Sequence, residues 1–233
     1  MDSDPNKQGS HAPVALEYES HLQRSRRVWN WWSSHYTLSE SDFAPMRSTT
    51  LDHLALSPGD EVIEIGCGPG VNFERIVRDI GPTGRLIAVD VSPRMLEQAK
   101  QRIEKHQWQN IELIHADANR LPVTTQFDAA VSTLSLSLMP EIRETIAEIY
   151  SCVKAGGSLA VFDLRPIPAG PLRVFNPILR PVLHWIANWN RRETVLDGLS
   201  MVFDDVDVVE SYLGGTTFTA IARKRQQVDI IED

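Results

Sequence analysis

The sequence has 233 residues, of which 42% are hydrophobic, and this favours a single domain with a sizeable core. The formal net charge of −8 and the lack of a basic block argue against binding to a nucleic-acid backbone. Two cysteines, Cys67 and Cys152, are too few for a disulfide framework and fit a reducing compartment.

The first residues lack the apolar centre of a signal peptide. No apolar run approaches the roughly 18 residues of a membrane-spanning helix. We therefore expect a soluble, cytoplasmic protein, monomeric or homodimeric, with a small-molecule partner and no nucleic acid.

The N-terminal part is predicted to be a disordered tail, residues 1–13, followed by two helices. Apolar residues at helical spacing predict these helices over about 13–35 and 43–56. The first carries three tryptophans within four residues, ending at Trp32. Two interpretations stay open: a helix that caps the core, or a lid and aromatic wall over a bound ligand.

Residues 61–70, EVIEIGCGPG, predict a buried strand that ends in a glycine-rich turn. Glycine has no Cβ and tolerates positive φ, so a ligand can lie directly against the main chain of such a turn. Amides at the start of the following helix can bind the polar groups of that ligand. Glu64 points away from Ile63 and Ile65, towards whatever the loop holds.

Strands and helices alternate after this turn. Strands are predicted over 85–90, 111–115, 127–131 and 158–163, and helices over 71–80, from Pro93, and over 140–154, where Gly156-Gly157 is expected to stop the helix. Residues 206–212 and 216–223 read as a closing antiparallel hairpin. We therefore predict an α/β fold with a doubly wound, mostly parallel, seven-stranded Rossmann-like sheet and added N-terminal helices.

Acidic residues stand at three predicted strand ends: Glu64, Asp90 and Asp117. Ligands of doubly wound sheets bind at the carboxyl ends of the strands, and an acid that ends the second strand can accept both hydroxyls of a ribose. A dinucleotide fingerprint would require a glycine where Val71 stands, since it reads G-x-G-x-x-G. The acids favour a ligand with positive charge and no phosphate.

At this point the sequence resembles the class I S-adenosylmethionine-dependent methyltransferases. The matching segments are VIEIGCGPG, IAVDVSPRML, HADA, FDAAVSTL and VKAGGSLAVF, which span about residues 61–162 in the family's order. The chain looks most like the small-molecule branch that includes quinone-biosynthesis C-methyltransferases and phosphatidylethanolamine N-methyltransferases. The NPPY/F signature of enzymes that methylate nucleic-acid or protein amino groups is missing after the fourth strand.

The resemblance implies S-adenosylmethionine as cofactor and S-adenosylhomocysteine as product. It implies that the loop glycines wrap the amino-acid moiety, with Glu64 near its ammonium group. Asp90 would hold the ribose hydroxyls and Asp117 would accept from the adenine amine. The full set of predicted cofactor-binding residues is Tyr36, Glu64, Gly66, Cys67, Gly68, Gly70, Asn72, Asp90, Val91, Met95, Asp117, Ala118 and Thr133.

The segment 165–192 is the most distinctive part of the chain, with five arginines and no acid. Apolar residues from Leu172 to Trp189 follow helical spacing, and two X-Pro steps predict two short helices. Three interpretations stay open: a cover helix with a solvated basic face, an interfacial helix on an anionic membrane, or an arginine that binds an acidic substrate group. Candidate substrate-binding residues are Trp32, Arg165, Arg173, Phe175 and His184.

Methyl transfer from a sulfonium is a one-step displacement, in which alignment and desolvation can supply most of the rate. An enol or phenol acceptor needs a base, for which His35, Tyr36, Asp163 and His184 are candidates. No histidine–cysteine cluster has metal-ligand spacing.

The leading hypothesis is methyl transfer to a small, largely apolar acceptor such as a quinone or lipid. An NAD-dependent oxidoreductase and a non-catalytic nucleoside-binding regulatory protein are the rivals. We expect one domain over 14–225, with lid helices over 14–56, a cofactor-binding core over 61–163, a substrate cover over 164–204, a hairpin over 205–224 and a frayed tail over 226–233.

Overall fold

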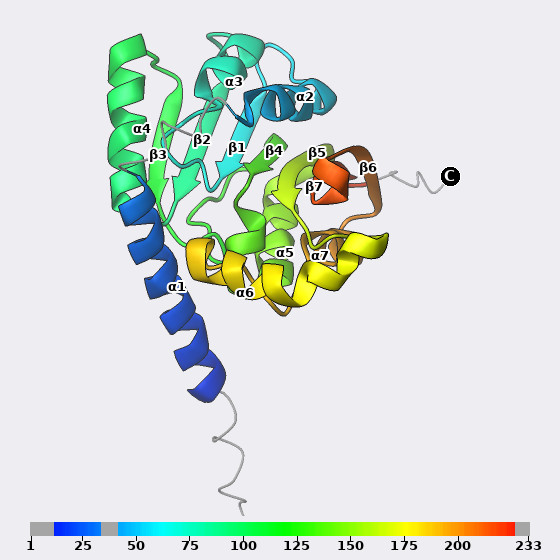
Figure 1. Cartoon of the computed structure of the whole chain (residues 1–233). Coiled ribbons are helices and arrows are strands. Elements are labelled where there is room, and N and C mark those ends of the chain that lie inside the picture. Colours follow the sequence, from blue (N-terminus) through cyan, green and yellow to red (C-terminus); the bar gives the residue numbers. More distant parts are fainter. Residues whose placement is uncertain (1–11, 34–41, 227–233) are drawn as a thin grey trace, which may run out of the picture.

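The computed structural model describes residues 12–33 and 42–226. These residues form one seven-stranded sheet with the strand order β3-β2-β1-β4-β5-β7-β6 (Figure 1). All neighbours are parallel except β7, which runs antiparallel to both β5 and β6. The strands are β1 (Glu61–Ile65), β2 (Arg85–Asp90), β3 (Ile111–His115), β4 (Phe127–Thr133), β5 (Val153–Leu164), β6 (Asp205–Tyr212) and β7 (Thr217–Arg223). The predicted α/β sheet and its closing hairpin are confirmed.

Strand order reverses between β1 and β4, and this is the point at which doubly wound sheets bind ligands. Ile65 of β1 pairs with Val89 of β2, and Asp90 pairs with His115 of β3. The register therefore brings the carboxyl ends of the first four strands to one edge of the sheet.

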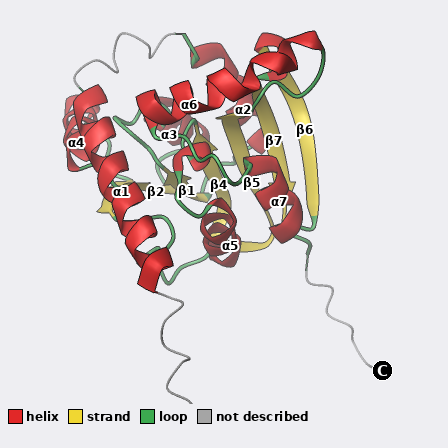
Figure 2. Ribbon diagram, turned by 60° about the horizontal axis from the view of Figure 1, so that its bottom comes forward, coloured by secondary structure: helices red, strands yellow, loops and turns green. Residues whose placement is uncertain are grey.

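Helices cover both faces of the sheet (Figure 2). Buried side chains of α2 (Ala44–Leu54), α3 (Phe73–Ile80) and α4 (Pro93–His106) form one core cluster with β1 and β2. Those of α5 (Ile142–Cys152) and α7 (Val195–Val202) form the other. α1 (Ala12–Trp32) and α6 (Asn176–Ala187) contact each other and lie beyond the sheet edge that carries the strand ends.

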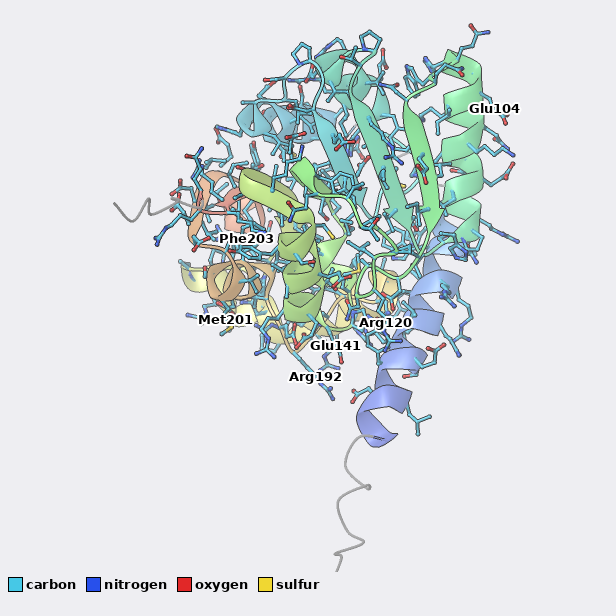
Figure 3. The ribbon with its side chains drawn as sticks, turned by 180° about the vertical axis from the view of Figure 1, so that it is seen from behind. Glu104, Arg120, Glu141, Arg192, Met201 and Phe203 are labelled. Carbon is cyan, nitrogen blue, oxygen red and sulfur yellow. The ribbon has the colours of Figure 1, made fainter. Side chains whose placement is uncertain are left out.

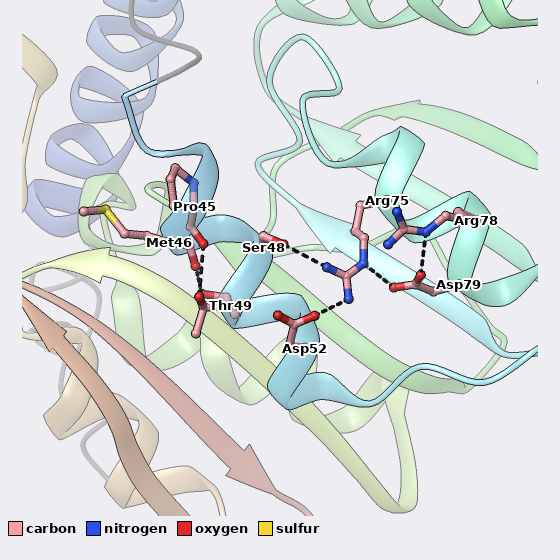
Figure 4. Close-up of polar contacts among 9 residues, drawn as sticks. Pro45, Met46, Ser48, Thr49, Asp52, Arg75, Arg78 and Asp79 are labelled. Carbon is pink, nitrogen blue, oxygen red and sulfur yellow. Dashed lines mark hydrogen bonds and ion pairs between the residues drawn. The ribbon is translucent and has the colours of Figure 1, made fainter.

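The helices begin and end where their sequences provide caps. Ser92 caps α4, because its hydroxyl accepts from the Met95 amide at 3.3 Å and Pro93 occupies the first turn. Arg75 of α3 ties α2 to the body: its guanidinium donates to Ser48 Oγ at 2.9 Å and forms ion pairs with Asp52 and Asp79 (Figure 4). These contacts place α2 beside α3.

The helix predicted over 140–154 ends early, which corrects the expected role of the glycine pair. α5 stops at Cys152, and β5 already includes Lys154, whose ammonium bonds Asp128 at 2.8 Å. A Cβ at Gly157 would lie 2.6 Å from the Asp128 carbonyl oxygen. Gly157 therefore permits close approach of β5 to β4 and does not stop a helix.

The segment 165–192 also differs from its prediction. Its first part is a 3₁₀ turn, η4 (Pro171–Phe175), and α6 follows without a break at Pro181. Phe175 and Val182, which the helical spacing places on one apolar face, are exposed, and no residue within Asn176–Ala187 is fully buried. The α-helix begins only at Asn176. A face predicted by α-helical spacing from Leu172 onwards therefore does not match the sides of α6.

The predicted tails lie almost entirely outside the described residues, although α1 begins at Ala12, two residues before the expected start of the domain. Helix α7 was not predicted. Its N-cap is Thr194, whose hydroxyl accepts from the Asp197 amide at 3.3 Å.

Candidate functional site

A cavity of about 330 Å³ lies at the carboxyl ends of the strands, within the size range of small-molecule sites. We call its strand-end side the floor: Gly66, Gly68, Val89, Asp90, Val91, Met95, Ala116, Asp117, Ala118 and Thr133. We call its α1–α6 side the cover: Leu22, Ser25, Trp29, Trp32, Ile186 and Ala187. Phe43 and residues after β4 complete the wall, which is mostly apolar.

The three loop glycines all have positive φ, but the space at their Cβ positions differs. A Cβ at Gly66 would lie 2.4 Å from Ser135 Cβ, and one at Gly70 would lie 2.5 Å from the Phe73 ring. At Gly68, with φ +54°, no atom lies within 4 Å of the Cβ position. Gly66 and Gly68 line the cavity and Gly70 does not. Only Gly68 leaves open space where a ligand can lie on the main chain.

Asp90 is held in a fixed orientation at the end of β2. Its Oδ2 accepts from the Gly68 amide at 2.9 Å, and its Oδ1 accepts from the Ser92 amide at 2.8 Å. Burial raises the pKa of Asp90, and these amides oppose that rise. Asp90 lines the cavity, and its carboxylate oxygens have more acceptor sites than these amides occupy, as required to accept two hydroxyl groups.

Glu64 and Asn72 lie behind the floor. Asn72 Nδ2 donates to Glu64 Oε1 at 2.7 Å and to Thr133 Oγ1 at 3.0 Å, and thereby holds Thr133 at the cavity wall. Glu64 Oε2 is buried without a hydrogen-bond partner among the described residues. Burial raises the pKa of Glu64 to about 8. Such an unpaired buried acceptor fits a ligand that brings a cationic donor.

Asp117 lines the cavity and also binds α1. Its Oδ2 accepts from the Tyr18 hydroxyl, and its Oδ1 accepts from the Asn119 amide at 3.1 Å. Burial, with the hydrogen bond to Asp117, raises the pKa of Tyr18. Sequence reasoning missed Tyr18, and no local pattern could have found it, because 99 residues separate the two partners.

Cys67 is buried, and burial raises the pKa of its thiol well above the ordinary value. A protonated, buried thiol is a packing group and a poor nucleophile. Val91, Met95, Ala118 and Thr133 all line the cavity, as expected for cofactor contacts.

Asp163 does not line the cavity, but it contacts a residue that does. Its carboxylate accepts from the Ser137 amide at 2.9 Å, from Ser137 Oγ at 2.6 Å and from the Leu164 amide at 2.7 Å. Burial raises the pKa of Asp163 to about 6. Asp163 thus holds Ser137, a wall residue of the turn η3 (Leu136–Leu138).

Of the candidate substrate-binding residues, only Trp32 lines the cavity. Arg165 Nε donates to the Gly215 carbonyl at 2.7 Å, and Arg173 and Phe175 are exposed. His184 lines a second cavity, of about 480 Å³. Its Nδ1 is 2.9 Å from the Trp189 carbonyl oxygen, to which it hydrogen-bonds. Glu141 and Arg192, labelled in Figure 3, line that cavity as well. His35 and Tyr36 lie outside the described residues.

The chain matches known methyltransferases over this region. Residues 62–157 match the family described as "Methyltransferase domain". The chain is 25% identical over 201 residues to a demethylmenaquinone methyltransferase of Listeria welshimeri, which covers 78% of this chain and 85% of that protein. It is 30% identical over 139 residues to one of Listeria monocytogenes, which covers 59% of each. The chain therefore spans less than two thirds of that second relative.

Among solved structures, the N-methyltransferase NodS from Bradyrhizobium japonicum, in complex with S-adenosyl-l-homocysteine, has the same fold. Its TM-score is 0.57 at 22% identity, over 78% of this chain and 87% of that one. The free acceptor on Glu64, the open main chain at Gly68 and the oriented Asp90 fit S-adenosylmethionine. On these matches and this geometry, residues 62–157 form a methyltransferase domain with a site that fits S-adenosylmethionine.

Proposed function

We propose that this protein transfers a methyl group to a small, largely apolar acceptor, of the quinone or lipid class. The observation that carries the proposal is the wall of the cavity. Opposite the polar carboxylates of the floor, Trp29, Trp32, Phe43 and Leu138 offer aromatic and aliphatic surface. Such a wall favours a flat or long apolar molecule. The two related proteins named for demethylmenaquinone support the same class.

In this proposal the floor holds the cofactor. Asp90 accepts the ribose hydroxyls, Asp117 accepts the adenine amine, and Glu64 balances the ammonium group. When bound, S-adenosylmethionine supplies an electrophilic methyl group. The cover excludes water from the acceptor, and exclusion of water with in-line alignment accelerates a displacement of this kind.

Proton removal from the acceptor is assigned to Asp163 acting through Ser137. Asp90 and Asp117 are the only acidic or basic side chains that line the cavity within the described residues, and both belong to the floor. Ser137 lines the cavity, and its Oγ donates to Asp163 Oδ1 at 2.6 Å. With its pKa at about 6, Asp163 is ionised at neutral pH and can take up a proton relayed by that hydroxyl. His35 and Tyr36 stay predictions.

The first test is ligand-dependent thermal stabilisation of the full chain. S-adenosylmethionine and S-adenosylhomocysteine should raise the melting temperature, whereas NAD should not, because Val71 replaces the third glycine of the dinucleotide fingerprint. Stabilisation by NAD alone would support the oxidoreductase rival.

The second test is transfer of a radiolabelled methyl group to a panel of acceptors. The panel should include a demethylated naphthoquinol, phosphatidylethanolamine and a polar catechol. Label in the quinol or lipid is expected. Label in the catechol alone would contradict the apolar class, and tight cofactor binding with no transfer to any acceptor would favour a regulatory protein.

A further inference from the structure

The outward side of η4 and α6 carries an apolar face that nothing within the described residues covers. Val174, Ile178 and Trp185 expose 72%, 66% and 75% of their surface, and Phe175 and Val182 are exposed as well. We call these five residues the η4–α6 face. Figures 1 and 2 show α6 on the outside of the molecule, away from the sheet. Single exposed apolar residues are ordinary, but a contiguous group marks an interaction surface.

The charge around this face selects its partner. Arg173 of η4 and Arg180 of α6 are exposed on the same two elements, and no acidic residue stands anywhere between Arg165 and Arg192. The rest of the chain is acidic, since the net charge is −8. An isologous dimer through this face would bring arginines of both copies together, which is unfavourable. An anionic surface satisfies both the apolar side chains and the arginines.

The same helix also closes the cavity. Ile186 and Ala187, at the end of α6, belong to the cover, and Ile186 is also partly exposed. The Ile186 carbonyl accepts from Trp32 Nε1 at 3.1 Å, which joins α6 to the aromatic wall. Val182 and Trp185 of the η4–α6 face therefore lie within one helical turn of residues that contact the acceptor space.

We propose that the η4–α6 face docks on an anionic lipid bilayer, with its apolar side chains among the headgroups and acyl chains. A lipid-like acceptor then passes from the bilayer into the cavity around the C-terminal end of α6. Docking is peripheral: within residues 12–33 and 42–226, no helix is long and apolar enough to cross a membrane. The inference rests on the proposed function for the nature of the acceptor only.

The test is co-sedimentation of the full chain with vesicles of phosphatidylcholine, with and without phosphatidylglycerol. Binding should be about ten-fold stronger to the anionic vesicles and should weaken with salt. The double variant Ile178→Ser/Trp185→Ser should lose about ten-fold in binding to the anionic vesicles. Arg173→Gln/Arg180→Gln should reduce binding to anionic vesicles to the level seen with neutral ones.

The matched control is Met201→Ser on α7, where an equally exposed side chain, at 71%, lies outside the η4–α6 face (labelled in Figure 3). This variant should bind like the parent. Equal binding of the parent to both vesicles, no binding at all, or an equal loss with Met201→Ser would overturn the proposal. So would a dimer in analytical ultracentrifugation that Ile178→Ser/Trp185→Ser dissociates.

Calorimetric binding of S-adenosylmethionine by each variant separates this inference from the proposed function. The substituted side chains lie outside the floor, so affinity for the cofactor should not change. Vesicle binding by a chain that binds no S-adenosylmethionine would overturn the function and leave docking intact. Cofactor binding without vesicle binding would overturn docking alone.

Discussion

In the floor of the cavity, polar side chains are held by backbone amides or buried amide groups, whereas in the cover two helices hold each other through a few bonds. Asp90 is fixed by the amides of Gly68 and Ser92. In the cover, Asn188 Nδ2 donates to Ser25 Oγ at 2.7 Å and to the His21 carbonyl at 3.1 Å. The floor is thus preorganised by the sheet, while the cover can separate at modest cost and admit ligands.

The largest expected effects are on stability, and they differ between two glycines of the same loop. Gly70→Ala should destabilise the protein by about 3 kcal/mol, because its Cβ would overlap the Phe73 ring at positive φ. Gly68→Ala adds its Cβ to open space and should cost about 1 kcal/mol of stability. It should nevertheless weaken S-adenosylmethionine binding. Thermal unfolding and calorimetry measure the two quantities, and a similar loss of stability in both variants would contradict the distinction.

The floor is next tested at Asp90. Asp90→Ala should weaken S-adenosylmethionine binding about a hundred-fold in calorimetry, because the ribose loses a charged acceptor and the Gly68 amide loses its partner. Glu104→Ala, which changes an exposed acid near the C-terminal end of α4 (Figure 3), is the control. Equal affinities of the two variants would show that Asp90 does not hold the ligand.

The cover is tested at Asn188, which has φ 59°. Asn188→Gly keeps this backbone conformation and removes two hydrogen bonds, worth about 1 kcal/mol each. Dissociation of S-adenosylhomocysteine, followed by stopped flow, should become about ten-fold faster, while the melting temperature should fall by only a few degrees. Gln107→Gly, at the left-handed C-cap of α4 with φ 58°, is the matched control and should leave the rate unchanged. A large drop in melting temperature for Asn188→Gly alone would show that the cover unfolds together with the core, and would contradict its independent opening.

The smallest effect on ligand binding concerns the proton on Glu64. With its pKa at about 8 in the free protein, this carboxyl is mainly protonated at pH 7, and a bound ammonium group favours its ionised form. Binding of S-adenosylmethionine at pH 7 should therefore release close to one proton, and affinity should rise up to about ten-fold from pH 6 to pH 7.

Calorimetry in buffers of different ionisation enthalpy measures that proton, and Glu64→Gln should abolish its release. The same raised pKa has a consequence for stability. The native state keeps a proton that the unfolded state loses, so the free energy of unfolding should fall as pH rises from about 4.5 to 8. Affinity independent of pH between 6 and 7 would contradict this account.

The floor could be predicted from sequence because its positions follow from local patterns. The β-branched run, the alternating glycines and the acid after β2 each specify strand, turn and ligand contact within a few residues. Gly66, Asp90, Asp117 and Thr133 accordingly meet at one cavity. Asn72 and Asp163 do not line the cavity but hydrogen-bond to residues that do, Thr133 and Ser137. Whether a residue lines the cavity or lies behind it depends on the direction of its side chain, which the spacing in the sequence does not give.

The cover could not be predicted in the same way. Contacts such as Tyr18 with Asp117 or Ser25 with Asn188 join residues far apart in the chain, and no periodicity encodes them. For α6, the phase of the helix depends on where it starts after η4. Helix α7, in contrast, had a readable signal, since Thr194 and Asp197 have the spacing of an N-terminal cap.

The tryptophans of α1 give the protein an optical probe of its own. Trp29 and Trp32 line the cavity, and Trp31 packs edge-on against Trp32 with ring centroids 5.1 Å apart. Any molecule that enters the cavity therefore changes the surroundings of indole rings that emit in the near ultraviolet. Ligand entry and departure can be followed by intrinsic fluorescence, without a label and before any acceptor is known.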